Sequence, residues 1–301
     1  MIDRTCLLLC LLAFFAQCTS SVQQPPPPAQ PTASFDDAVS ADAPGAADSL
    51  IVREDLSKHL KACNEHLEGS ITIYDQQRGK WIISDSAEIY REALPASTFK
   101  IINLLIALEE GLVRDENEVM IWTGETDTTL YGNRPEISRD LTVKEAFELS
   151  AVWVFLDLAK KIGKDRYAYY LKATGYGNGN LEQEGEDFWN FGSFGVSPLE
   201  QVQFLRNVYE GKSPFSKRST DILKKVMLTE ETADYKIRAK TGWTREGGMN
   251  LGWWVGYAET EQGVYFFATR LYQDRKFNSP SFGPCRKDVT RAMLRELEII
   301  R

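Results

Sequence analysis

A serine and a lysine three residues apart could do chemistry together. Ser97 and Lys100 stand in residues 95–100, PASTFK. Residues at i and i+3 of a helix share one face, so the lysine can reach the serine hydroxyl. A serine is a weak nucleophile until a base lies within hydrogen-bond reach. Burial by Phe99 and the apolar run that follows would lower the pKa of Lys100 and favour the neutral amine that a base must be.

The residues after this pair predict the element that holds it. The apolar run 101–108 predicts a buried helix ending at Gly111, with Ser97 at or near its start. The same residues also suit a helix that is merely capped by a serine. The pair alone therefore does not establish catalysis, and other motifs must decide.

Hydrophobic periodicity predicts the frame around this helix. Strand patterns occur near both ends of the body, and helical patterns fill about 112–228 between them. We expect strands over 70–75, 80–85, 236–241, 251–259 and 264–272, an early helix through Leu56, Leu60 and Leu67 ending near Gly69, and a last helix over 289–300. These patterns predict one sheet built from the two ends of the body, with an inserted helical region.

Two later motifs carry groups that could complete a site. Ser150-Ala151-Val152 opens a helical pattern, and its hydroxyl could relay a proton, although a serine there is also a good N-cap. Lys240-Thr241-Gly242 is expected to end a strand beside Trp243. Lys and Thr there can bind a carboxylate, and the glycine lets a substrate approach the backbone. Ser-x-x-Lys with a later Lys-Thr-Gly is a known catalytic pairing.

Charge and histidine content exclude several functions. The net charge of -8, without a clustered basic stripe, argues against nucleic acid as a partner. The two histidines, His59 and His66, lie close together early in the chain, which excludes a Ser-His-Asp scheme with a distant histidine. No residues have metal-ligand spacing, and we expect no metal.

The N-terminal segment has the features of an export signal. The short apolar run 6–16 after Arg4 suits a signal peptide, assigned to 1–21, better than a membrane span. Cys18 could instead be the lipid-bearing first residue of a lipoprotein, although Gln17 is unusual before such a cysteine. Residues 22–49 are proline- and alanine-rich and predict a disordered tether ahead of a body at 50–301. We therefore expect an exported, periplasmic protein, free or lipid-anchored.

Cys63 and Cys285 are the two cysteines of the body. They would form a disulfide in an oxidising compartment if their Cα atoms lay close enough, and two buried thiols are the equal alternative. The sequence leaves both open.

The motifs occur in the order of a known family. From about residue 50 to 301 the chain resembles the class D serine β-lactamases, the oxacillinase family, within the penicillin-binding, transpeptidase-like superfamily. The matching features are residues 95–103, Ser150-Ala151-Val152, Tyr176-Gly177-Asn178, Phe188-Trp189, Lys240-Thr241-Gly242-Trp243, residues 253–256 and Arg286. A second Tyr-Gly-Asn, at 131–133, is out of order. The resemblance implies a transpeptidase-like α/β (α+β) fold with a mainly antiparallel sheet, and hydrolysis of β-lactam antibiotics.

The resemblance also implies roles for the matching positions. Ser97 would be the acylated nucleophile, and Lys100 would be carbamylated by CO2 or bicarbonate to N6-carboxylysine and act as general base. Ser150 would pass a proton to the lactam nitrogen, and the backbone N–H groups of Ser97 and Trp243 would form the oxyanion hole. The carbamate pocket would comprise Phe99, Val152 and Trp189, and substrate would contact Lys240, Thr241, Gly242, Trp243 and Arg286.

One residue departs from the family pattern and keeps rival functions open. Asn190 follows Trp189 where the family commonly has leucine, beside the carbamate and its water path. An amide there would admit water, bind the carbamate or destabilise it, so the rate of deacylation is not predicted. The rivals are a penicillin-binding DD-peptidase and a β-lactam sensor domain, both slow to deacylate, and a non-catalytic binding lipoprotein. The motifs determine neither the substrate spectrum nor the oligomeric state.

Overall fold

Strands from both ends of the chain form a seven-stranded sheet. The computed structural model describes residues 48–124, 126–277 and 279–301, so Cys18, the expected signal peptide and nearly all of the tether lie outside the described residues. The strand order is β1-β3-β2-β9-β8-β7-β6, in which only β1 and β3 pair in parallel. The strands are β1 (Ser49–Val52), β2 (Glu68–Asp75), β3 (Lys80–Ile83), β6 (Leu228–Glu231), β7 (Tyr235–Glu246), β8 (Met249–Thr260) and β9 (Gly263–Asp274).

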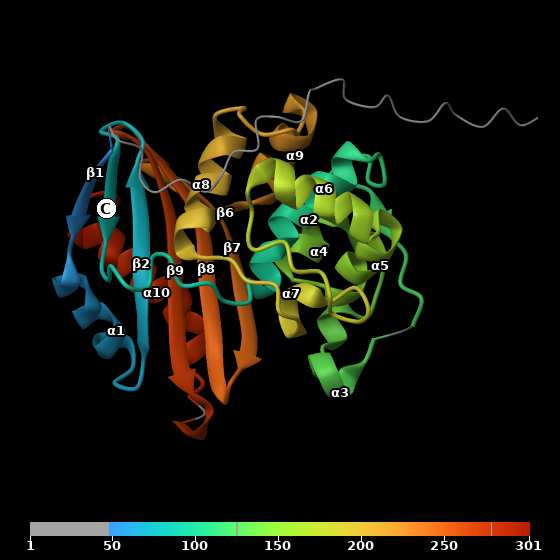
Figure 1. Ribbon diagram of the computed structural model, residues 1–301, viewed down its shortest axis with the longest axis horizontal. Helices are drawn as coiled ribbons and strands as arrows, with labels where there is room; N and C mark the ends of the chain where they lie inside the picture. The colour runs from blue at the N-terminus through green and yellow to red at the C-terminus, as the bar shows by residue number, and fades with distance from the viewer. Residues whose placement is uncertain (1–47, 125, 278) are drawn as a thin grey trace, which may run out of the picture. The chain divides into compact units, whose positions relative to one another are not determined.

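Helices cover both faces of this sheet. Alternate residues of a strand point to opposite faces, and in β8 Trp254 joins one buried cluster while Trp253 and Val255 join the other. The first cluster lies under α1 (Lys58–Cys63) and α10 (Phe282–Glu296). On the opposite face α8 (Pro198–Tyr209) packs on β9, β2 and β8, as Figure 1 shows.

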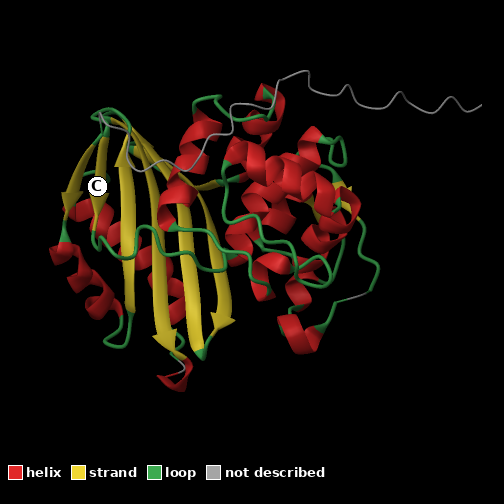
Figure 2. Ribbon diagram, viewed as in Figure 1, coloured by secondary structure: helices red, strands yellow, loops and turns green. Residues whose placement is uncertain are grey.

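The middle of the chain forms a helical region beside β7 (Figure 2). Its central helix, α2 (Lys100–Glu109), is buried from Lys100 to Leu108 and ends before Gly111, whose φ of 70° is left-handed. Around it lie α3 (Thr128–Tyr131), α4 (Val143–Glu148), α5 (Val152–Ile162), α6 (Lys164–Thr174), α7 (Phe188–Phe191), α9 (Lys217–Val226) and a two-stranded sheet of β4 (Val119–Met120) and β5 (Leu141–Thr142). The predicted fold class, an antiparallel sheet with flanking helices and a helical insertion, is confirmed.

Two predicted helices were placed wrongly. The last helix begins at Phe282 and not at 289, because Gly283 and Pro284 interrupt its apolar period, although proline is tolerated in a first helical turn. The early helix is a 3-10 turn, η1 (Glu54–Ser57), followed by α1, which ends at Cys63. Leu67 precedes β2 as a loop residue, yet it is fully buried in the same cluster as Leu56.

The strand boundaries also differ from the prediction. The first strand begins at Ser49, within the stretch expected to be tether. β7 continues to Glu246, so Lys240-Thr241-Gly242 lies in the middle of a strand and not at its end. The turn from β7 to β8 is Gly247-Gly248, with φ of 54° and 82°, which suits a tight hairpin and lets both strands extend beyond their apolar stretches.

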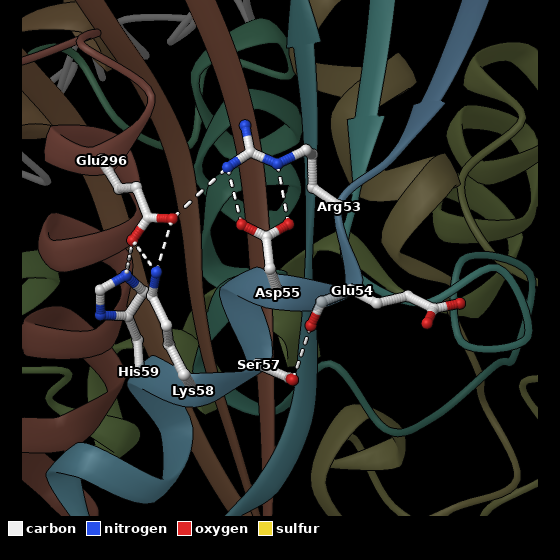
Figure 3. A network of polar contacts seen from close by, with 7 residues as sticks. All are labelled: Arg53, Glu54, Asp55, Ser57, Lys58, His59 and Glu296. Carbon is white, nitrogen blue, oxygen red and sulfur yellow. Dashed lines mark hydrogen bonds and ion pairs between the residues drawn. The ribbon is translucent and has the colours of Figure 1, made fainter.

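Two sets of contacts join α1 to α10. A disulfide links Cys63 to Cys285, with Cα atoms 5.9 Å apart, which decides the question that the sequence left open. At the other end of α10, Glu296 accepts hydrogen bonds from Lys58 and His59, at 2.8 and 2.7 Å, and a longer one from Arg53 (Figure 3). Helix α10 is thus joined to α1 near both of its ends. None of the helices in the described part of the chain has the length and apolar content to cross a membrane.

Candidate active site

Ser97 lies in a 3-10 turn, η2 (Ala96–Phe99), that leads directly into α2. Ala96 has a φ of 51°, a left-handed conformation that a non-glycine residue adopts only when its surroundings impose it. Lys100, the first residue of α2, has its Nζ 3.1 Å from Ser97 Oγ. The serine is partly exposed, whereas the lysine is only 1% exposed. The structure therefore brings the predicted nucleophile and base into contact.

Burial controls the charge of Lys100. It lowers the pKa of Lys100 to about 8, although the nearby carboxylate of Asp187 opposes the shift, and Arg134 lowers the pKa slightly further. The amine lies 5.1 Å from the centre of the Phe155 ring. At pH 7 a pKa of about 8 leaves roughly one lysine in ten neutral, about two orders of magnitude more than at the ordinary value.

Aromatic side chains enclose this lysine. Phe99 stacks on Trp189 with ring centres 4.9 Å apart and planes 7° apart. Trp189 is completely buried, and its indole Nε1 has no hydrogen-bond partner among the described residues. A buried donor without a partner costs free energy unless something else accepts from it. Val152, at the start of α5, is also buried.

Ser150 and Lys240 contact each other across the boundary between the helical region and β7. Lys240 Nζ donates to Ser150 Oγ at 2.5 Å and to the carbonyl of Thr241 at 3.1 Å. Burial, together with the charges of Lys100 and Arg286, holds the pKa of Lys240 well below its ordinary value. Ser150 does not cap α5, because Ala151 is the N-cap. Ser150 has a φ of 54°, and this left-handed conformation turns the chain sharply before the helix.

The backbone of β7 is open where the motif lies. β6 pairs only with residues 236–238, and the last contact is the Ala239 N–H donating to the carbonyl of Met227. Successive N–H groups of a strand point in opposite directions, so those of Thr241 and Trp243 point to the same side as that of Ala239. A Cβ on Gly242 would point to the face of β7 that η2 covers and would lie 2.8 Å from the carbonyl oxygen of Pro95. Glycine is therefore required for η2 to approach the strand.

Arg286 reaches the carbonyl of Gly242 from α10. Its Nη1 donates to the carbonyl of Gly242 at 2.6 Å, and its Nε donates to the carbonyl of Gly283 at 2.9 Å. Burial lowers the pKa of Arg286 to about 10. A Cβ on Gly252, the register partner of Trp243, would lie 2.8 Å from Arg286 Cδ, so this glycine leaves room for the arginine. Trp243 is 45% exposed, and the centre of its ring lies 5.5 Å from the guanidinium carbon of Arg286.

The structure adds residues that sequence reasoning missed. Arg134 donates to the carbonyl of Leu149 at 2.7 Å and to that of Ser150 at 3.5 Å, so it fixes the turn that carries the second serine. Tyr131, in the Tyr-Gly-Asn copy that is out of order, donates to Asp187 at 2.5 Å. The repeated Tyr-Gly-Asn tripeptide could have drawn attention to Tyr131, whereas no sequence motif marks Arg134.

The expected Tyr-Gly-Asn motif is linked by hydrogen bonds to the turn that carries Ser97. The buried hydroxyl of Tyr176 donates to Gln201 at 3.0 Å, and Gln201 Nε2 donates to Thr98 Oγ1 at 2.9 Å. Thr98 in turn donates to the carbonyl of Pro95 at 2.7 Å. Burial raises the pKa of Tyr176. This chain of hydrogen bonds anchors η2 and does not reach Ser97.

Comparisons with known proteins agree with this fold and site. The penicillin binding protein transpeptidase domain matches residues 69–292. β-Lactamase OXA-48 of Klebsiella pneumoniae is 35% identical, covering 80% of this chain and 89% of the relative, and OXA-10 of Pseudomonas aeruginosa is 34% identical, covering 76% and 85%. A crystal structure of a class D β-lactamase from Sebaldella termitidis has a TM-score of 0.79 and 39% identity, covering 84% of this chain and all of that one.

The serine-lysine turn, the Lys-Thr-Gly strand and the matched domain define a penicillin-binding, transpeptidase-like protein. Within that superfamily the chain belongs to the class D β-lactamases, serine hydrolases that act on the cyclic amide of β-lactams. The resemblance drawn from the ordered motifs is thus confirmed.

Proposed function

We propose that this protein hydrolyses β-lactam antibiotics through an acyl-enzyme on Ser97, with Lys100 as the general base in its carbamylated form, N6-carboxylysine. The observation that carries the proposal is the pocket of Lys100. It combines a buried amine 3.1 Å from the serine hydroxyl with the unpartnered indole N–H of Trp189. The lysine must be neutral to react with CO2, and its lowered pKa supports this.

The residues of the pocket fit the carbamate. When present, the carbamate supplies an anionic oxygen that can accept the proton of a hydroxyl or a water. Trp189 offers a buried donor to such an anion, and Phe99 and Val152 exclude bulk water from it. Exclusion of water preserves a group that hydrolysis would otherwise return to the free amine.

Acylation then follows from the groups around Ser97. The proton of Ser97 passes to the base on Lys100 as the oxygen attacks the lactam carbonyl. The N–H groups of Ser97 and Trp243 bind the developing oxyanion, and the outward direction of N–H groups at alternate residues of β7 supports this role for Trp243. Ser150, held by Lys240, delivers a proton to the leaving nitrogen.

Three cationic or polar side chains orient the substrate. Lys240, Thr241 and Arg286 lie on or beside β7, and we assign them the carboxylate of the β-lactam. Gly242 allows the close approach and Trp243 lies beside the bound ring system. A charged hydrogen bond of this kind contributes about 1.5–3 kcal/mol.

We also propose that the protein acts after export, in the periplasm, either free or anchored by a lipid on Cys18. The disulfide between Cys63 and Cys285 supports an oxidising compartment, because such bonds persist outside the reducing cytosol.

Turnover of a chromogenic cephalosporin tests the proposed function. We expect multiple turnovers, at a rate that bicarbonate raises when dissolved CO2 is low. Intact-protein mass spectrometry should show no acylation of Ser97→Ala and at most a trapped acyl-enzyme for Lys100→Ala. Lys160→Ala, which removes an exposed lysine of α5, is the matched control and should behave as the unchanged protein. A stoichiometric burst without turnover would instead indicate a sensor or a slow DD-peptidase, and full hydrolysis by Lys100→Ala would refute the carbamate scheme.

A further inference from the structure

The first turn of α10 sets the position of the arginine to which we assign the substrate carboxylate. Arg286 Nε donates to the carbonyl of Gly283 at 2.9 Å, while its Nη1 donates to the carbonyl of Gly242. No side chain caps the start of the helix at Phe282, and Gly283 is a weak helix former. An uncapped helix end frays unless other contacts hold it. The direction of the guanidinium therefore depends on what holds this turn.

The disulfide holds this turn one residue before the arginine. Cys63 is the last residue of α1, and Cys285 is fully buried in the cluster that α1 and α10 cover. Because Cys285 and Arg286 are neighbours in the chain, the bond fixes the backbone from which the arginine side chain extends. The end of α1 is thus covalently joined to the site of a substrate contact.

Asn64, the next residue after α1, holds the chain just ahead of the helix. Its Nδ2 donates to Ser279 Oγ at 2.8 Å and to Ser281 Oγ at 3.0 Å, and these two hydroxyls lie 2.7 Å apart. Its Oδ1 accepts from the backbone N–H of His66 at 2.8 Å, and the ring of His66 stacks on Phe277, with ring centres 3.6 Å apart. The loop after α1 therefore holds the chain that leads into α10.

We propose that Cys63 and Asn64 are positioning residues that place Arg286 for the carboxylate of the substrate. This inference rests on the proposed function. A side chain that is held in its bound position before the substrate arrives loses less entropy on binding, so its charged hydrogen bond contributes more to affinity. Both residues act through the start of α10, so their loss should weaken binding of a carboxylate and leave the attack by Ser97 unchanged.

The other end of α10 provides the matched control. Glu296, the last residue of the helix, accepts hydrogen bonds from Lys58 and His59 of α1 (Figure 3). Glu296→Ala therefore loosens the same pair of helices but leaves the turn that carries Arg286 in place. A general loosening of the fold would follow from either change, whereas loss of carboxylate binding should follow only from changes at the start of α10.

The test compares KM and kcat of the full enzyme for a β-lactam with a free carboxylate and for its methyl ester. Cys63→Ser with Cys285→Ser removes the bond, and Asn64→Ala removes both donations to the serines. We expect KM for the acid to rise about tenfold without the bond, and about threefold in Asn64→Ala, where the bond remains. KM for the ester and kcat for both substrates should not change, the pattern that marks lost binding alone. Glu296→Ala should leave every value unchanged.

The outcomes separate this inference from the proposed function. Equal rises in KM for acid and ester, or the same rise in Glu296→Ala, would overturn the positioning role. An unchanged KM for the acid in both test variants would also overturn it, while turnover by the unchanged enzyme would sustain the proposed function. If the unchanged enzyme does not turn over the acid, both proposals fail. Thermal melts show whether the serine variant is folded, and if it is not, Asn64→Ala, which keeps the disulfide, decides alone.

Discussion

The charge state of one lysine links the sequence motif to its chemistry. Spacing alone placed Lys100 beside Ser97, but spacing does not say whether the side chain is an ammonium or an amine. In the structure, burial lowers the pKa of Lys100 to about 8, which makes the neutral amine accessible near neutral pH. Strained backbone at Ala96 and Ser150 shows that both serine turns are held in place by their surroundings.

This lowered pKa predicts how reactivation depends on pH. A lysine with a pKa of about 8 loses its proton as the pH rises, so the reactive amine increases about tenfold per pH unit below pH 8 and levels off above it. After CO2 has been removed, we expect recovery of activity to follow this curve when dissolved CO2 is held fixed. Stopped assays at pH 6, 7, 8 and 9 measure it. A recovery rate that is flat or falls from pH 6 to 8 would contradict the assignment of Lys100.

At the scale of elements, the substrate edge depends on the partial pairing of β7. β6 covers β7 only to the level of Ala239, and the strand beyond remains open beside η2. Two glycines make this arrangement possible, because a side chain at either position would clash with a neighbour. Gly242 lets η2 approach one face of the strand, and Gly252 leaves the space on the other face that Arg286 crosses to reach the carbonyl of Gly242.

Gly252→Ala should therefore displace Arg286 without touching the nucleophile. The added Cβ would lie 2.8 Å from Arg286 Cδ and 2.9 Å from Phe282 Cζ. We expect KM for β-lactams with a free carboxylate to rise at least about tenfold, the loss of one charged hydrogen bond, with a smaller change in kcat. The matched substrate is the methyl ester of the same β-lactam, which lacks the charge. An equal rise in KM for acid and ester would show that Arg286 does not bind the carboxylate.

For the whole molecule, charge separates the site from the rest of the surface. The chain carries a net charge of -8, yet Arg134, Lys240 and Arg286 lie on or beside the segments that carry the site motifs. Cationic groups gathered in an acidic protein attract an anionic substrate to one place. The acidic surface also agrees with the absence of a basic stripe for nucleic acid in the sequence.

The disulfide is expected to stabilise the entire body. Cys63 and Cys285 are 222 positions apart in a chain of 301 residues, so the bond restricts most of the unfolded body. Replacing both by serine should lower the free energy of unfolding by about 2–5 kcal/mol, as measured by urea denaturation. The unchanged protein with a reducing agent is the matched control and should lose the same amount. A loss below about 0.5 kcal/mol would show that the bond contributes little.

Much of this fold and site could be predicted, because strands and the buried helix carry clear periodicity and the motifs keep their order. The disulfide could not, since it depends on a distance between residues far apart in the sequence. Helix α10 was placed late because Gly283 and Pro284 hide its period. The pairing of Tyr131 with Asp187 was missed because it joins the end of α3 to the residue before α7, and only the packed structure brings these two segments together.

The cross-link has a further consequence for the fate of a damaged molecule. The exposed loop around 182–186, which leads to Asp187, is a natural place for a protease to cut. Because the bond between Cys63 and Cys285 spans that loop, the two fragments of a chain cut there remain one covalent molecule. Ser97 and Lys240 would then lie on different fragments, yet both fragments contribute strands to the sheet, and the bond between α1 and α10 would hold the fragments together.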